Sequence, residues 1–396
     1  MRTLVVSDLH LGSASRADLL RAGSLRGPLI DLARGADRLV LLGDALELRH
    51  GPARDALAAA RSFLGDLGAA LAGREVVVCP GNHDYALLAP WLTKRRETSE
   101  VATLEVEQRL PAAEGSPVLA ALAELLAPAS TTVAYPGIWL REDVYAMHGH
   151  YLDCHVTIPT LERLGIGAMN RVLGRPSDSL RSVEGYESVS SPLYAWIDAV
   201  ARQGPTNPAL NGSVTVRAWH ALGGGDSTHS PPAGERPVAA VRDRIAGVSL
   251  AMRRRALMRA FPLVVAALNR AGMGPLRADI SSTELRRAGL RAIGEVAERL
   301  GLGEAYVVFG HTHRAGPLAG DDIAEWRGPG GARLVNTGCW TYERAFLTPA
   351  GAQHNPYWPG SCVMVEDDGP PRLERLLADL SHDELRAARA ASLTGS

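Results

Sequence analysis

Residues 4–10 read LVVSDLH, an apolar run that ends in an aspartate, one spacer and a histidine. A short run rich in β-branched residues predicts a buried strand. Such a strand would end at the edge of a sheet and direct Asp8 and His10 into one cleft. Because carboxylate and imidazole groups both bind metals, the stretch outlines a metal site. Alone, the pair is a weak signal, since many strands end in two polar residues.

Four further apolar runs end in side chains that can bind a metal or transfer a proton. They are residues 39–44 (LVLLGD), 76–84 (VVVCPGNHD), 144–149 (VYAMHG) and 306–313 (YVVFGHTH). Together they supply Asp44, Asn82, His83, His148, His311 and His313. Alternation of such strands with helices predicts an α/β fold with the site at the carboxyl ends of the strands.

The five blocks, taken in order, resemble the calcineurin-like metallophosphoesterase superfamily. That family is identified by Asp-x-His, Gly-Asp, Gly-Asn-His-Asp or Gly-Asn-His-Glu, a His-Gly strand end and Gly-His-x-His. All five are present here, over residues 3–150 and 304–376. The resemblance implies a β-sandwich flanked by helices (αββα) and leaves the stretch between the two ranges unexplained.

Composition limits the possible partners and locations. A chain of 396 residues that is 46% hydrophobic can bury a large core, and a net charge of -1 gives no basic field for nucleic acid. We therefore expect no nucleic-acid partner. There is no run of about 20 predominantly apolar residues, so we predict no membrane span. Four cysteines without metal-site spacing, and no room for a leader before the first strand, favour a cytoplasmic protein.

The order of predicted elements divides the chain. Residues 1–150 and 304–380 carry the strands and predict the core. Helices are predicted over residues 29–33, 53–71 and 118–126, and short strands over 131–133 and 138–140 on either side of a turn at Pro136 and Gly137. Residues 381–396 read as a C-terminal tail.

Residues 151–303 lose the alternation of strand and helix. Helices are predicted over residues 161–173, 191–201, 238–269 and 282–300, with a flexible loop rich in Gly and Pro at about 204–237. Because metal-site strands lie on both sides of this segment, we predict that it is an inserted helical cap near the cleft. Its basic helix over 238–269 packs on the core or makes a peripheral lipid contact.

The resemblance also implies a pair of divalent cations. The first would bind Asp8, His10, Asp44 and His313, and the second would bind Asp44, Asn82, His148 and His311. Asp44 is then the bridging ligand. Oxygen and imidazole ligands without a thiolate suit Mn²⁺, Fe, Zn²⁺ or Co²⁺.

His83 has a different implied role, beside the phosphate, where it stabilises charge or protonates the leaving oxygen. Asp84 either orients His83 or caps the following helix. For Glu47 we favour a solvated loop carboxylate over an acceptor behind a ligand. Local hydrogen bonds explain three further polar residues as well as a site role does, and these stay outside the catalytic set: His150, Asp153 and His155.

The predicted function is hydrolysis of a small phosphomonoester or phosphodiester by attack of a metal-bound hydroxide, with two metal ions. One alternative is a pyrophosphatase acting on a lipid-linked or sugar nucleotide, because those enzymes of the superfamily carry a similar helical insertion. Their pattern has Arg where this chain has His83, and Asp where it has His150. An alternative of another class is a non-catalytic metal-binding scaffold. The sequence does not indicate an oligomeric state.

Overall fold

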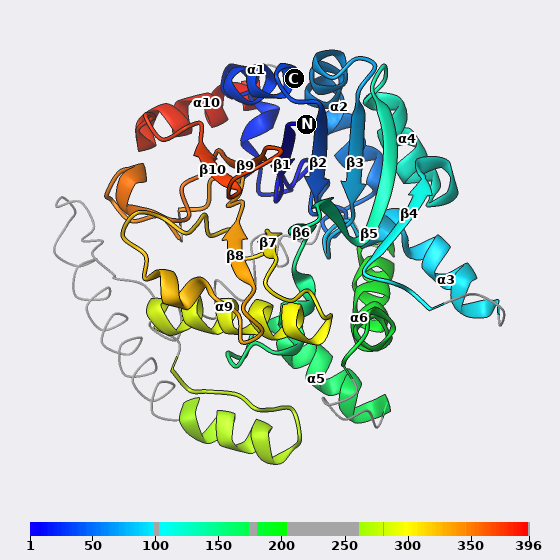
Figure 1. Cartoon of the computed structure of the whole chain (residues 1–396), viewed down its shortest axis with the longest axis vertical. Helices are drawn as coiled ribbons and strands as arrows, with labels where there is room; N and C mark the ends of the chain where they lie inside the picture. Colours follow the sequence, from blue (N-terminus) through cyan, green and yellow to red (C-terminus); the bar gives the residue numbers. More distant parts are fainter. Residues whose placement is uncertain (99–102, 174–179, 204–260, 280, 345, 395–396) are drawn as a thin grey trace, which may run out of the picture.

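A ten-stranded mixed sheet forms the centre of the protein (Figure 1). The computed structural model describes residues 1–98, 103–173, 180–203, 261–279, 281–344 and 346–394. The strand order is β10-β9-β1-β2-β3-β5-β6-β7-β8, and β4 pairs with β5. The strands are β1 (Thr3–Val6), β2 (Arg38–Leu42), β3 (Glu75–Cys79), β4 (Glu107–Pro111), β5 (Ser130–Arg141), β6 (Val144–Met147), β7 (Tyr306–Phe309), β8 (Arg333–Asn336), β9 (Ser361–Val365) and β10 (Arg372–Arg375).

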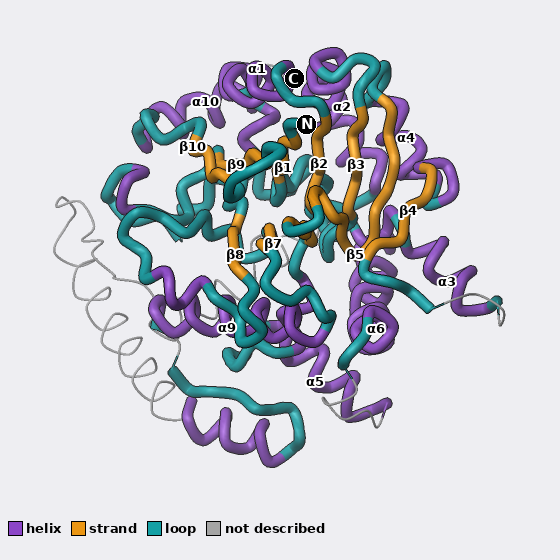
Figure 2. The backbone as a smooth tube through the Cα atoms, in the orientation of Figure 1, coloured by secondary structure: helices purple, strands orange, loops and turns teal. Residues whose placement is uncertain are grey.

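Helices lie around the sheet, and Figure 2 shows α1, α2 and α10 toward one end of the molecule and α5, α6 and α9 toward the other. The labelled α-helices are α1 (Gly27–Arg34), α2 (Ala53–Ala70), α3 (Ala89–Glu97), α4 (Pro117–Leu125), α5 (Leu161–Leu173), α6 (Val183–Gln203), α9 (Ser282–Arg299) and α10 (His382–Thr394). Residues 261–270 are also helical. Short 3₁₀ helices are η1 (Leu19–Arg21), η2 (Gly23–Leu25), η3 (Tyr85–Leu87), η4 (Ala112–Glu114), η5 (His150–Cys154), η7 (Ile323–Trp326) and η8 (Ala352–His354).

Most of the described helices begin and end where the sequence predicts. The apolar period over residues 53–71 gives α2, and α4 is capped by Ser116, whose Oγ accepts the N–H of Leu119. The helix predicted over 191–201 is longer, because α6 begins at Val183. The loop at 204–237 and residues 238–260 of the basic helix lie outside the described residues.

Strand β5 connects the two halves of the sheet, and here one prediction is wrong. The two short strands expected around Pro136 and Gly137 are a single strand, Ser130–Arg141. Its first half pairs with β3 and β4, and its second half pairs with β6. Proline, which has no N–H to donate, is tolerated because it lies where the strand changes partner.

Side chains on both faces of the sheet are buried, and they belong to two separate clusters. One face contributes alternate residues, such as Val5, Val40 and Val77, to a cluster of buried residues that all come from strands. The neighbouring residues on the same strands, such as Leu4 and Leu39, belong to a larger cluster that includes the helices. Burial on both faces explains why these strands read as continuous apolar runs. The protein therefore has the mixed α/β fold that the sequence predicts.

Candidate metal centre

The ends of five strands bring polar side chains to one place. Asp8 and His10 follow β1, while β2, β3, β6 and β7 are followed by Asp44, Asn82, His148, His311 and His313. Asp8 and His148 are completely buried, and Asp44 is 1% exposed. Carboxylates and imidazoles at such depth require charged or hydrogen-bonding partners.

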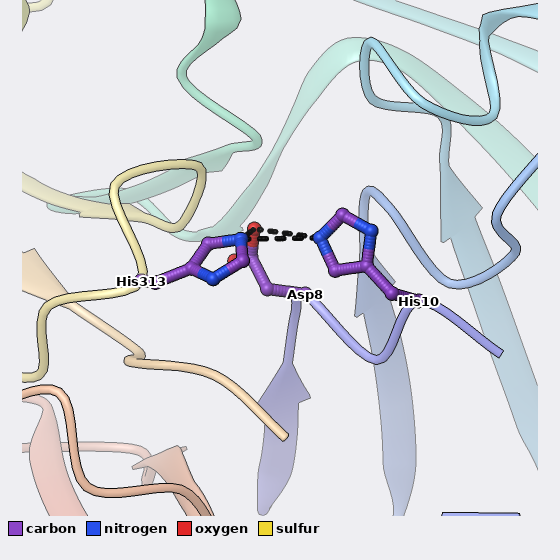
Figure 3. Close-up of side chains that lie close together, drawn as sticks. All are labelled: Asp8, His10 and His313. Carbon is purple, nitrogen blue, oxygen red and sulfur yellow. Dashed lines mark hydrogen bonds and ion pairs between the residues drawn. The ribbon is translucent and has the colours of Figure 1, made fainter. Parts of the chain in front are cut away.

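The first group of side chains is Asp8, His10 and His313 (Figure 3). His313 Nε2 lies 3.1 Å from His10 Nε2 and 3.3 Å from Asp8 Oδ1. All the ligand atoms of the group lie within 4.8 Å of one another. Residues more than 300 positions apart in the chain thus converge with the spacing needed to hold one metal ion.

The second group is Asp44, His148 and His311, and Asn82 lies among them. His148 Nε2 is 3.2 Å from Asp44 Oδ2 and 3.0 Å from Asn82 Oδ1. Asn82 Oδ1 is also 3.0 Å from His311 Nδ1. Every ligand that the sequence predicts for the second cation therefore lies in this group.

Asp44 belongs to the second group and also lies close to His10 of the first. Its Oδ1 accepts the backbone N–H of His83 at 2.8 Å, so Oδ2 is the oxygen that faces the site. Oδ2 lies 3.8 Å from His10 Nε2 as well as 3.2 Å from His148 Nε2. The atoms of His10, Asp44 and His83 form a third group with metal-binding spacing.

Hydrogen bonds on the far side of the rings show which nitrogens face the centre. His148 Nδ1 lies 2.9 Å from the carbonyl oxygen of Leu42 and must donate to it. His10 Nδ1 lies 3.0 Å from Glu47 Oε2 and donates to that carboxylate. Each ring therefore directs Nε2 at the carboxylate oxygens of the centre, where only positive charge, a proton or a cation, satisfies them.

The pKa values of His148 and Asp44 also show that the centre favours positive charge beside its carboxylates. Burial acts to lower the pKa of His148, but the carboxylates of Asp44 and Asp8 raise it to about 9. Burial likewise acts to raise the pKa of Asp44, but His148, His83 and His10 hold it well below its usual value. A divalent cation would supply this charge without a proton, so the donor set fits a metal.

The backbone is bent sharply at the same residues. Among the described residues, six other than glycine have a positive φ, and five of them are Asp8, His10, Asp44, His311 and His313. This left-handed conformation costs ~1–3 kcal/mol for each such residue. The strain is therefore concentrated where the strands end and the side chains must turn toward one another.

Two glycines allow the loops to approach closely. A Cβ at Gly43 would overlap the ring of His148, and one at Gly310 would overlap the carboxylate of Asp8. Gly43 also has a φ of 83°, which favours glycine. The Gly of the Gly-Asp and Gly-His-x-His blocks is thus needed for packing at the centre.

Glu47 is a functional residue that the sequence analysis misjudged. It is 2% exposed, and its Oε2 lies 3.0 Å from His10 Nδ1 and 2.7 Å from His83 Nδ1. It therefore orients two histidines and is not a solvated loop carboxylate. The signal was its position between Leu46 and Leu48, which indicates a buried loop.

Two further carboxylates support the centre. Asp84 accepts backbone N–H groups from Gly81 at 2.6 Å and Ala45 at 2.8 Å. It neither orients His83 nor caps the next helix, as the sequence suggested, but ties two ligand-bearing loops together. Asp153, left outside the predicted set, has Oδ2 3.1 Å from His311 Nε2. The contact between Asp153 and His311 Nε2 orients the His311 ring so that its Nδ1 faces Asn82.

Comparison with known proteins gives one family. The model of the calcineurin-like phosphoesterase family matches residues 1–224 of the 396, more than half of the chain. The chain belongs to this family. The match includes Asp8, Asp44, Asn82 and His148, and the geometry above adds the two histidines beyond it.

The membership of the calcineurin-like phosphoesterase family confirms the resemblance drawn from the five blocks. A search of curated proteins gives no match to the chain. Within the described residues, no helix has the length and hydropathy needed to cross a bilayer. A metal-dependent phosphoester hydrolase is the activity that this family suggests for the site.

Proposed function

We propose that the protein hydrolyses a small phosphate ester with the aid of two divalent cations. The observation that carries the proposal is the position of Asp44 Oδ2, which lies 3.8 Å from His10 Nε2 and 3.2 Å from His148 Nε2. A carboxylate that bridges two cations must face two sets of ligands in this way.

The residues named from the sequence would hold the two cations. Asp8, His10, Asp44 and His313 would bind the first, and Asp44, Asn82, His148 and His311 the second. The absence of a thiolate from this set supports Mn²⁺, Fe, Zn²⁺ or Co²⁺. When bound, two such cations neutralise the phosphate oxygens and lower the pKa of water near phosphorus.

His83 and Glu47 would move the proton. His83 Nδ1 donates to Glu47 Oε2, 2.7 Å away, which leaves Nε2 free to face the substrate. Burial lowers the pKa of His83 to about 4. An anionic phosphate beside the ring raises that pKa, and Glu47 stabilises the imidazolium that forms. Nε2 then carries the proton that the leaving oxygen takes.

We also propose the finer architecture expected from the sequence. The strand-only cluster that includes Val5 and Val308 supports a β-sandwich between helical layers. Residues 1–150 and 304–380 would form the core and 151–303 the inserted cap. The helices α5, α6 and α9 support a helical cap. The tail at 381–396 contains α10, whose Arg389 donates to the carbonyl of Arg16 at 2.6 Å.

The test is metal content and turnover of the purified protein. We expect about two divalent ions per chain and hydrolysis of p-nitrophenyl phosphate or bis-p-nitrophenyl phosphate. Asp44→Asn should lose metal and at least a hundredfold in kcat. Asp66→Asn, at a surface carboxylate that pairs with Arg26, is the control and should behave as wild type.

Other outcomes would select the alternatives. Near-normal turnover of Asp44→Asn would exclude a bridging role for that carboxylate. Bound metal without turnover of any of these substrates would favour the non-catalytic metal-binding scaffold, and absence of both metal and turnover would contradict the proposed function. Hydrolysis of nucleotide sugars or lipid-linked nucleotides in preference to both aryl phosphates would favour the pyrophosphatase.

A further inference from the structure

A carboxylate of the 151–303 segment is buried against the core, outside the proposed metal centre. Glu187 lies on α6 and is 3% exposed. A carboxylate at this depth requires hydrogen-bond donors, because it loses its contacts with water. Three phenol hydroxyls of the core and one serine hydroxyl of α6 surround it: Tyr85, Tyr135, Tyr151 and Ser191. Glu187 is therefore the point at which one helix meets three segments of the core.

Both oxygens of this carboxylate accept hydrogen bonds. Oε1 accepts from Tyr135 and from Tyr151, the latter at 2.6 Å. Oε2 accepts from Ser191, while Tyr85 Oη lies 3.3 Å from Oε2 and donates to Ser191 Oγ at 2.7 Å. Burial, and then the charge of Glu187, raise the pKa of Tyr135 and of Tyr151 well above the usual value. Both phenols therefore keep the protons that they donate.

Two of these tyrosines follow ligands proposed for the second cation. Tyr85 begins η3, three residues after Asn82. Tyr151 lies in η5, three residues after His148 and two before Asp153. Because each intervening stretch is short, a displacement of either phenol would also move the ligand next to it. Glu187 thus restrains two loops that carry proposed ligands.

The remaining contacts extend to the third ligand and to the sheet. Asp153 on η5 lies 3.1 Å from His311 Nε2, so a shift of η5 would also reach His311. Tyr135 lies on β5, just before that strand begins to pair with β6. Within the described residues, Glu187 and the three phenols make no hydrogen bond to the ligands proposed for the first cation alone: Asp8, His10 and His313. The network therefore lies on the side of the second cation.

We infer that Glu187 is a positioning residue for the second cation, and that it acts by fixing η3 and η5 from α6. The inference rests on the proposed function and gives the 151–303 segment a part in it. A buried carboxylate is a costly way to attach a helix, because apolar packing attaches one without removing a charge from water. Its directional bonds to phenols instead fix the positions of three segments, as the ligand geometry of a metal site requires.

Glu184 is a matched control on the same helix, one turn before Glu187. Its Oε1 accepts the backbone N–H of Leu104 at 2.9 Å and lies 3.7 Å from Arg95 Nη2. It also joins α6 to the core, but the segment that it contacts leads to β4, which carries no proposed ligand. A general weakening of the α6 interface can therefore be separated from an effect at the second cation.

The experiment titrates the chelated, full-length protein with Mn²⁺ by calorimetry, and measures Tm and the Mn²⁺ dependence of p-nitrophenyl phosphate hydrolysis. Asn82→Ala identifies which binding step belongs to the second cation. Glu187→Leu leaves the phenols without an acceptor, so it should raise the Kd of that step about 10-fold or more. The Kd of the other step should stay within about twofold of normal. Half-maximal hydrolysis should require about 10-fold more Mn²⁺.

Two further variants grade the effect. Glu187→Gln restores an acceptor oxygen for Tyr135 and Tyr151 and should recover most of the affinity. Tyr151→Phe removes one hydroxyl and keeps the ring, so it should raise the Kd of the same step about 3- to 10-fold. Glu184→Gln should bind both ions as the wild type does. If Glu187→Leu does not fold, the Tyr151→Phe variant decides the question in its place.

The outcomes separate this inference from the proposed function. A wild type with two ions and turnover, whose Glu187 and Tyr151 variants bind both ions within about twofold of normal, would overturn the inference alone. Equal weakening of both binding steps would also overturn it, because Glu187 would then support only the fold. A wild type without metal and turnover would overturn the proposed function and the inference with it.

Discussion

At the scale of single residues, the centre depends on the groups behind the ligands. Glu47 contacts His10 and His83, Asp153 contacts His311, and a backbone carbonyl contacts His148. Such partners fix the tautomer and the orientation of each ring, and losing one typically weakens metal affinity or activity about 10- to 100-fold.

Replacing Glu47 with Gln removes the negative charge that accepts hydrogen bonds from His10 and His83. The neutral amide oxygen is a weaker acceptor for the two N–H groups than the carboxylate, and it no longer stabilises a protonated His83. We expect kcat for p-nitrophenyl phosphate to fall about 10- to 100-fold, with reduced metal occupancy on the His10 side. The control is Glu75→Gln, whose carboxylate contacts Thr132 and Arg109 instead. An unchanged kcat in Glu47→Gln would show that the negative charge of Glu47 is not needed for hydrolysis.

His155 predicts a pH dependence of stability away from the ligands. Its Nε2 lies 2.8 Å from the hydroxyl of Tyr186, and burial, followed by Arg299, lowers its pKa to about 4 from 6.5. The unfolded chain then binds a proton between these values that the folded chain does not. Stability is therefore complete above pH 6.5 and falls as the pH drops toward 4.

The measurement is chemical unfolding at pH 7 and pH 5. The wild type should lose roughly 1 to 2 kcal/mol more than His155→Gln over this interval. His354→Gln, at an exposed position, should follow the wild type. Parallel losses in the wild type and His155→Gln would mean that His155 does not titrate differently on folding.

The residues at strand ends could be predicted because each one ends an apolar run that strand periodicity identifies. The contacts of Glu47 and Asp153 could not be predicted, since the sequence around a loop carboxylate does not show which group it contacts. For Glu47, the flanking Leu46 and Leu48 indicate only that the loop is buried. Only tertiary contacts between segments far apart in the chain distinguish a carboxylate that faces a histidine from one that faces water.

At the scale of elements, β5 determines how the ligand strands meet. Its first half continues the parallel set β1, β2 and β3, and its second half pairs with β6, which leads to His148. The sequence predicted a turn here because proline and glycine usually interrupt strands. The pairing of both halves with different partners overrides that preference. Strand β4 was not predicted, since its residues, EQRLP, are mostly polar.

Gly137 lies where β5 passes from pairing with β4 to pairing with β6, and this position requires a glycine. A Cβ at this position would overlap the carbonyl oxygen of Ala146 and the ring of Tyr145 on β6. We expect Gly137→Ala to reduce stability by roughly 1 to 3 kcal/mol, as overpacking does, and to weaken metal binding through His148. Thermal unfolding and metal titration measure the two effects.

Gly65 provides the matched control for this substitution. It lies within α2, and a Cβ there has no atom within 4 Å. Gly65→Ala should leave stability unchanged or raise it by up to about 1 kcal/mol, because alanine favours the helix. If both alanines had the same effect, the close approach of β5 and β6 would not be what Gly137 provides.

At the scale of the whole molecule, the proposed cations connect the two halves of the sheet, on either side of β5. Their ligands follow β1, β2, β3, β6 and β7, so a bound cation links strands from both halves. A ligand that binds only the folded state stabilises it by RT ln(1 + [L]/Kd), about 2.7 kcal/mol at 100 times Kd. Metal removal should therefore lower Tm.

The check is a thermal scan of chelated protein with increasing Mn²⁺ or Zn²⁺. We expect Tm to rise by several degrees and to depend on metal concentration. Asp44→Asn should lose most of the rise, and Asp66→Asn should keep it. A chelated protein whose Tm does not respond to any of the candidate ions would contradict a site at these strands.

The wide spacing of the ligands, from Asp8 to His313, has a consequence for biosynthesis. A growing polypeptide presents the aspartate and histidine after its first strand almost at once. The histidines proposed to complete the two cation sites, His311 and His313, are synthesised about 300 residues later. Partial chains can therefore offer only incomplete coordination. With the proposed ligands, complete coordination would require translation at least as far as His313 of the 396 residues.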